Sequence, residues 1–157
     1  MSKYNWISLT VSKFKEFLGR ARFCAFPSNI KALEWDKMTT TEKGCYGEQL
    51  ALAYCQKELG FKLITRNWYD QAREIDLICT DRGVLVFVEV RLRSKEAKIS
   101  GLESINNKKK SALRRAALAY LKRLYPRPHT YRFDVVSIAY GSSDDYQIMH
   151  YRNVALF

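Results

Sequence analysis

The alternation of apolar and polar positions divides most of the chain into short strands and two helices. One helix is predicted from a capping sequence at Thr39 to Gly60, and a second over about 105–124, where Pro126 and Pro128 follow. Five strands are predicted at about 61–69, 74–80, 84–91, 131–140 and 145–151. The order α-β-β-β-α-β-β predicts an α/β fold in which helices pack against a mixed sheet.

The most apolar run of the sequence, residues 84–90, contains a single acid, Glu89. Such a run is typical of a strand that is buried on both faces. A lone ionised carboxylate in that environment is strongly destabilising unless it is paired or binds a metal ion. Glu89 is therefore the first candidate for a functional side chain.

Two further acids are expected near Glu89. Side chains alternate along a strand, and the turn at residues 81–83 makes the strands of Asp76 and Glu89 neighbours, so these two carboxylates are predicted to converge. Arg91 shares the face of Glu89. Glu48 lies on the helix stripe that is expected to pack on the sheet, and it is the third candidate.

Converging carboxylates are the ligands that Mg²⁺ or Mn²⁺ prefers. Such a centre activates water for attack on phosphorus, and a cation such as Arg91 can position the nucleophile or stabilise the transition state. Each acid also has a structural explanation as a polar residue near the end of an element. For Glu48 and Glu74 that explanation is as good as the functional one.

Positive charge is concentrated in one part of the chain. The net charge is +11, and residues 91–132 contain 13 basic and 2 acidic side chains. An acidic centre followed by a basic flank favours a nucleic-acid partner, although a solvated helix face would give the same composition. The candidate backbone contacts are Arg93, Lys95, Lys98, Lys108 and Lys109.

The ends and the cysteines suggest how the chain is organised. Residues 1–37 are predicted to form a basic N-terminal extension, helical or flexible, and residues 38–157 the main domain, with Met38 as an alternative start. The four cysteines are widely spaced and are predicted to be reduced core residues of a cytoplasmic protein. The sequence contains no apolar stretch of transmembrane length, so no membrane partner is expected.

Asp76 and Glu89-Val90-Arg91 together resemble the D…(D/E)-x-K signature of the PD-(D/E)xK nuclease superfamily. A longer series resembles the YraN-type family of predicted endonucleases, which are relatives of archaeal Holliday-junction resolvases. The series consists of Gly47-Glu48, Arg66-Asn67, residues 74–78, residues 86–90, Lys109 and residues 132–136. The resemblance covers residues 41 to about 139. It implies a restriction-endonuclease-like αβββαβ core and a homodimer. It also implies a divalent-metal site made by Glu48, Asp76, Glu89 and the backbone carbonyl of Val90.

The chain departs from the family pattern at two positions. Arg73 stands where the family has Gly, and Arg91 stands where it has Lys. Lysine can lose its proton in a buried site, whereas arginine effectively cannot. If the residue at this position must act as a base, Arg91 makes the protein inactive. If it only orients water, the protein is expected to be active. Lys108 and Lys109 are the candidates to replace the missing lysine.

The sequence thus predicts a nuclease that uses Mg²⁺ or Mn²⁺ to hydrolyse phosphodiester bonds in DNA, with branched DNA among the candidate substrates. Asp76, Glu89 and Arg91 are the predicted catalytic residues. The first alternative, based on Arg91, is a catalytically inactive nucleic-acid-binding protein on a nuclease fold. The second is an adaptor whose basic flank binds another acidic partner.

Overall fold

The computed structural model describes residues 37–71, 73–141 and 146–156. Apart from Lys37, the predicted N-terminal extension lies outside this range. The described helices and strands are α2 (Thr40–Lys57), β1 (Lys62–Asp70), β2 (Arg73–Asp81), β3 (Val84–Ser94), α3 (Asn107–Lys122), β4 (Tyr131–Tyr140) and β5 (Tyr146–Tyr151). Their order confirms the prediction of a mixed α/β fold.

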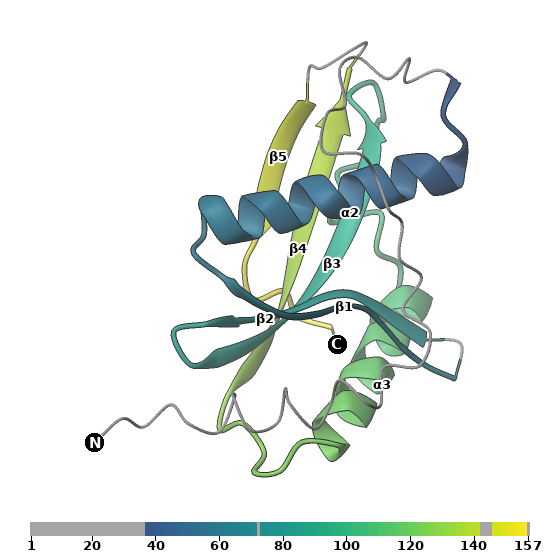
Figure 1. Ribbon diagram of the computed structural model, residues 1–157. Helices are drawn as coiled ribbons and strands as arrows, with labels where there is room; N and C mark the ends of the chain where they lie inside the picture. Colours follow the sequence, from purple (N-terminus) through teal and green to yellow (C-terminus); the bar gives the residue numbers. More distant parts are fainter. Residues whose placement is uncertain (1–36, 72, 142–145, 157) are drawn as a thin grey trace.

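The five strands form one mixed sheet in the order β1-β2-β3-β4-β5. Three neighbouring pairs are antiparallel, and β3 and β4 are parallel because α3 connects them. The β1–β2 hairpin crosses the lower part of Figure 1, whereas β3, β4 and β5 run upward together. β3 lies at the centre of the sheet, which explains its apolar sequence.

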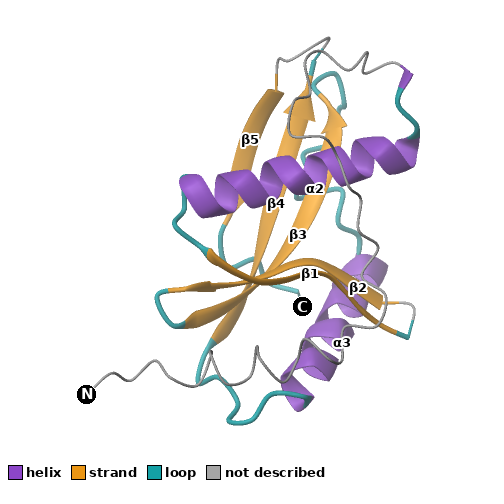
Figure 2. Cartoon of the chain, viewed as in Figure 1, coloured by secondary structure: helices purple, strands orange, loops and turns teal. Residues whose placement is uncertain are grey.

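The two helices cover opposite faces of the sheet (Figure 2). On one face, α2 packs through Ala51 and Cys55 on a core that includes Val86 and Val88 of β3. On the other face, α3 packs on a second core that includes Phe87. Adjacent β3 residues therefore contact different helices, as the alternation of side chains along a strand requires.

The helix starts follow from local hydrogen bonds. The predicted capping box is present: the Thr39 side chain accepts from the Glu42 backbone N–H, and the Glu42 carboxylate accepts from the Thr39 backbone N–H. Gly60 follows α2 with φ of 69°, a left-handed conformation that glycine adopts without strain. The side chain of Asn106 caps α3. These contacts fix where the first turns of both helices lie.

The sheet forks between β2 and β3. Their ladder runs from Asp81↔Val84 to Leu77↔Val88 and then stops. Beyond that point the start of β2 remains paired with β1 as far as Asp70↔Arg73, and the end of β3 remains paired with β4 as far as Ser94↔Tyr140. Asp76 and Glu89 are the residues directly after the last shared pair, so they lie where the two halves of the sheet separate.

Two sequence predictions are wrong at this fork. The third strand was predicted to end at about residue 91, but β3 continues to Ser94 because the parallel ladder with β4 supports it. The alternation of side chains assumed for this strand would place Ile75 and Leu77 on the same face. Instead Ile75 packs in the core under α3, whereas Leu77 packs in the core under α2. The alternation of side chains is therefore interrupted at Asp76.

The cysteine prediction holds only in part. Cys55 and Cys79 are free, buried thiols as predicted, and burial raises the pKa of each to about 12. Cys45 is disulfide-bonded, which contradicts the prediction that its thiol is reduced. Neither of the described helices combines the length and the apolar character that a membrane span needs.

Candidate metal-binding active site

A cavity of about 490 Å³ opens at the fork of the sheet. Its acidic lining comes from three elements: Glu48 from α2, Asp76 from β2 and Glu89 from β3. The structure therefore brings together the three carboxylates that were predicted to form the site. The other lining residues are Thr40, Lys43, Gly44, Val90, Arg91, Leu92, Lys109 and Tyr140.

Asp76 bridges the two halves of the fork. Its Oδ2 accepts a hydrogen bond of 2.6 Å from the backbone N–H of Val90 in β3, which replaces the ladder contact that the separating strands no longer make. Burial raises the pKa of Asp76 well above its ordinary value, and the charge of Glu89 raises it further. Asp76 is thus a carboxylate held in an environment that disfavours its charge.

Glu89 is the most buried of the three acids, with 3% of its surface exposed. Its Oε1 lies 2.9 Å from Nζ of Lys109 in α3 and 3.7 Å from the guanidinium of Arg91. Its Oε2 is buried and has no hydrogen-bond partner. Burial raises the pKa of Glu89, although Lys109 opposes that shift. One oxygen of this carboxylate is therefore satisfied, and the other remains unpaired.

Glu48 is held from the neighbouring edge of the sheet. Its Oε2 accepts a 2.9 Å hydrogen bond from Nδ2 of Asn67 in β1. The preceding Gly47 lies so close to β3 that an added Cβ would be 3.1 Å from Cβ of Leu92, so α2 approaches the strand closely here. Burial raises the pKa of Glu48, and the Asn67 bond partly offsets the shift.

Arg91 is held mainly by a loop. Its Nε donates to Oγ of Ser104 at 3.1 Å, and its Nη2 donates to the Ser104 carbonyl at 3.4 Å. Ser104 in turn donates to the carbonyl of Gly101. Lys109, one of the two lysines that were offered as replacements, lies closer to Glu89 than Arg91 does.

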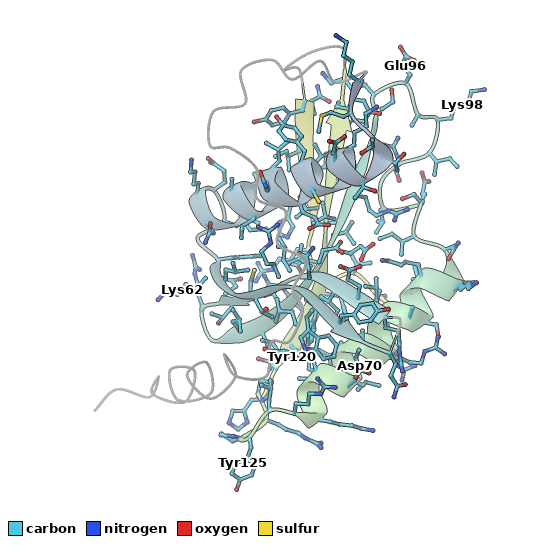
Figure 3. The ribbon with its side chains drawn as sticks, turned by 45° about the vertical axis from the view of Figure 1, so that its right-hand side comes forward. Lys62, Asp70, Glu96, Lys98, Tyr120 and Tyr125 are labelled. Atoms are coloured by element: carbon cyan, nitrogen blue, oxygen red, sulfur yellow. The ribbon has the colours of Figure 1, made fainter. Side chains whose placement is uncertain are left out.

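The other predicted nucleic-acid contacts lie outside the cavity lining. Arg93 donates to the carbonyl of Ala97 at 2.8 Å, and the backbone N–H of Lys95 donates to Tyr140. Lys98 is exposed and points away from the molecule at the upper right of Figure 3. Lys108 is exposed in the first turn of α3. Of the five basic candidates, only Lys109 contacts the acids.

The donor set has the right chemistry for Mg²⁺ or Mn²⁺, since all three side chains offer carboxylate oxygens. In the conformation described for residues 37–71, 73–141 and 146–156, no three acidic, histidine or cysteine side chains lie close enough together to hold a metal ion. One oxygen of each acid is already bonded within the protein. A metal ion would therefore use the second oxygen of each acid, and these second oxygens would have to approach one another while the first oxygens keep their bonds.

Two residues that contact the site were not identified as site residues from the sequence. Asn67 adopts a left-handed φ of 50° in the middle of β1, where its amide reaches Glu48. A strongly turn-forming residue inside a predicted strand was the available signal. Ser104 gave no comparable signal, because a serine in a polar loop is ordinary.

Comparison with known proteins identifies relatives of this chain. The model of the uncharacterised protein family UPF0102 matches residues 47–138, which include all three acids. A UPF0102 protein of Dichelobacter nodosus is 44% identical over 72% of this chain and 85% of the relative. A UPF0102 protein of Chlorobaculum parvum is 37% identical over 69% of this chain and 83% of the relative. A UPF0102 protein of Carboxydothermus hydrogenoformans is 34% identical over 76% of this chain and 100% of the relative.

Proposed function

The chain belongs to the uncharacterised protein family UPF0102, and from the carboxylates at its sheet fork we propose that it is a metal-dependent nuclease that hydrolyses phosphodiester bonds in DNA. The observation that carries this proposal is the buried, unpaired Oε2 of Glu89. An uncompensated carboxylate oxygen in a core strand is costly, and such costs are tolerated mainly where they serve function.

The wider surroundings of Glu89 support the proposal. Among the described residues, three buried side-chain atoms have no hydrogen-bond partner: Arg66 Nη2, Asn67 Oδ1 and Glu89 Oε2. All three belong to the fork or to the residues beside it, since Asn67 contacts Glu48 and the charge of Arg66 lowers the pKa of Glu48. A fold that satisfies its buried polar atoms elsewhere leaves them unpaired here.

The fold also agrees with the proposal. The α-β-β-β-α-β order has one acid on α2 and two on the antiparallel strands β2 and β3, as the resemblance to PD-(D/E)xK nucleases implies. In this assignment Glu48, Asp76 and Glu89, with the Val90 carbonyl, hold Mg²⁺ or Mn²⁺. The ion supplies a Lewis acid that activates water and neutralises charge on the phosphate.

Lys109 takes the role that the motif lysine has in the family. Its ammonium contacts Glu89 and lines the cavity, so it can orient the attacking water and stabilise negative charge on the phosphate. The Arg91 guanidinium adds positive charge beside the site while it is anchored to Ser104. This division of roles favours an active nuclease over the inactive binding protein, because catalysis does not depend on deprotonating Arg91.

The basic segment provides the contacts to DNA. Lys43 and Lys109 line the cavity from the first turns of α2 and α3, and Lys108 is exposed on the outer side of α3. The cation-rich rim suits the phosphates on both sides of a cleaved bond, whereas the acidic centre suits the metal. Binding through phosphates of this kind weakens steeply with salt.

The test is DNA cleavage by the full chain in Mg²⁺ or Mn²⁺, on linear and on branched duplexes. Asp76→Asn and Glu89→Gln should each reduce the rate by about 100-fold or more. Glu96→Gln removes an acid that Figure 3 shows in solvent, and it should leave the rate unchanged. Cleavage that is unaffected by both site variants would refute the proposal.

A matched pair of lysines tests the cation. Lys109→Met should reduce cleavage by about 100-fold or more, because it removes the ammonium beside Glu89. Lys108→Met removes the same charge one residue earlier, where the side chain is exposed, and should weaken only DNA binding. Equal losses from the two variants would show that Lys109 contributes charge alone. If the parent does not cleave DNA and the Arg91→Lys variant does, the natural protein is the inactive nucleic-acid-binding protein.

A further inference from the structure

Asn67 interrupts β1 at the position opposite Asp76. The flanking pairs are Arg66↔Leu77 and Trp68↔Ile75, and Asn67 between them has a φ of 50°. Left-handed backbone is uncommon inside a strand, and asparagine is one of the few residues with a side chain that adopts it readily. After this turn, Trp68 and Ile75 pack under α3, whereas Leu77 packs under α2.

The side chain of Asn67 makes one specific contact. Its Nδ2 donates to Oε2 of Glu48 at 2.9 Å, and its Oδ1 is buried without a partner. The amide cannot be reversed, because its oxygen would then face the carboxylate. Since one oxygen of Glu48 is fixed in this way, the other remains available to the cavity that Glu48 lines.

We propose that Asn67 is a positioning residue that holds Glu48 in the orientation needed to bind the divalent ion. This inference rests on the proposed function and deepens it. A residue needed only to bend the strand would be glycine, which adopts a left-handed φ at lower cost. A residue needed only to fasten α2 to the sheet would not leave a buried amide oxygen unpaired. The combination of both features at one residue indicates a role in orienting the carboxylate.

The experiment measures Mn²⁺ binding to the full chain by titration calorimetry, without DNA. Asn67→Gly keeps the left-handed backbone but removes the amide, and it should weaken Mn²⁺ binding by about 10-fold or more. The matched control is Asn153→Gly. Asn153 is also left-handed, with a φ of 53°, but it is exposed and does not line the cavity. The control should bind Mn²⁺ like the parent.

A second variant separates the amide from the backbone. Asn67→Ala removes the same amide but places a Cβ-bearing residue at a left-handed φ, so its melting temperature should lie below that of Asn67→Gly. The two variants should nevertheless lose the same Mn²⁺ affinity. Different affinities that follow the melting temperatures would overturn the proposal, because the effect would then be one of stability.

A double-mutant cycle tests whether Asn67 acts through Glu48. Glu48→Ala alone should weaken Mn²⁺ binding, and Asn67→Gly should then add little in that background. If the parent and the Asn67→Gly variant bind Mn²⁺ equally well, this inference is overturned but the proposed function is left intact. An equal loss from Asn67→Gly in both backgrounds would also overturn it. A parent that binds no Mn²⁺ would overturn both proposals.

Discussion

Replacing Asp76 by asparagine should stabilise the protein while it abolishes activity. The Asp76 carboxylate is partly buried at the cavity and lies near Glu89, so burial and repulsion both disfavour its charge. An asparagine can still accept the hydrogen bond from the Val90 N–H through its amide oxygen. The substitution therefore removes an unfavourable charge and retains the favourable contact.

The expected gain follows from those two contributions. Replacement of a buried charge by a neutral group of similar shape is worth about 1–3 kcal/mol when its hydrogen bond is kept. For a domain of this size, 2 kcal/mol corresponds to a rise in Tm of about 6–10 °C. The assay is thermal unfolding in EDTA, because a bound metal ion would compensate the charge of Asp76 in the parent.

The pH dependence has a definite sign. Because the pKa of Asp76 is raised on folding, the folded state binds more protons than the unfolded state between the two pKa values. The parent's stability from this group is complete below the unfolded pKa, about 3.9, and is lost as the pH rises through the folded pKa. The advantage of Asp76→Asn should therefore be largest near pH 7 and shrink toward pH 4.

Asp134→Asn provides the opposite control. The Asp134 carboxylate is also buried, but Arg132, His150 and the backbone of Asn153 all contact it. Burial would raise its pKa, yet these hydrogen bonds together hold the pKa below its usual value. Loss of that charge leaves Arg132 incompletely paired in the core and should destabilise the protein by about 3 kcal/mol. If both asparagine variants lower Tm at pH 7, the account of Asp76 is refuted.

Further substitutions test Arg91, the loop that holds it, and a glycine of α2. Arg91→Lys should lower Tm, since a lysine cannot make the two bonds to Ser104. The rate of DNA cleavage should stay within a few-fold of the parent, because α3 already supplies an ammonium. Loss of activity would show that the guanidinium itself is needed. Gly101→Ala should destabilise the fold by about 1–3 kcal/mol, because the added Cβ would overlap Ser137. Gly44→Ala meets no neighbour within 4 Å and should instead stabilise α2 by about 0.5–1 kcal/mol, so opposite signs in thermal unfolding are expected.

Local patterns in the sequence predicted most of the fold and the two central acids. Strand periodicity and the turn after Asp81 were enough to pair Asp76 with Glu89, because both features depend on near neighbours in the chain. The extent of β3 was underestimated because the charged residues that follow Arg91 made its end resemble a loop. Pairing with the distant strand β4 stabilises that end, and such pairing leaves no local signal.

The remaining parts of the site depend on tertiary geometry. The sequence offered Lys108 and Lys109 equally, and only the rotation of α3 on the sheet determines that Lys109 reaches Glu89. The interrupted alternation at Asp76 depends on the left-handed conformation of Asn67 in the neighbouring strand. Both features arise where elements meet, so patterns within a single element could not predict them.

The most direct test of the central claim is anomalous diffraction from crystals of the full chain that are soaked in Mn²⁺. A Mn²⁺ peak is expected in the fork, with ligands from Asp76 and Glu89 and from the Glu48 oxygen that Asn67 leaves free. The same soak of Asp76→Asn crystals should show no peak at that position. Mn²⁺ bound only outside the fork of the parent crystals, with Oε2 of Glu89 still without a partner, would refute the metal site.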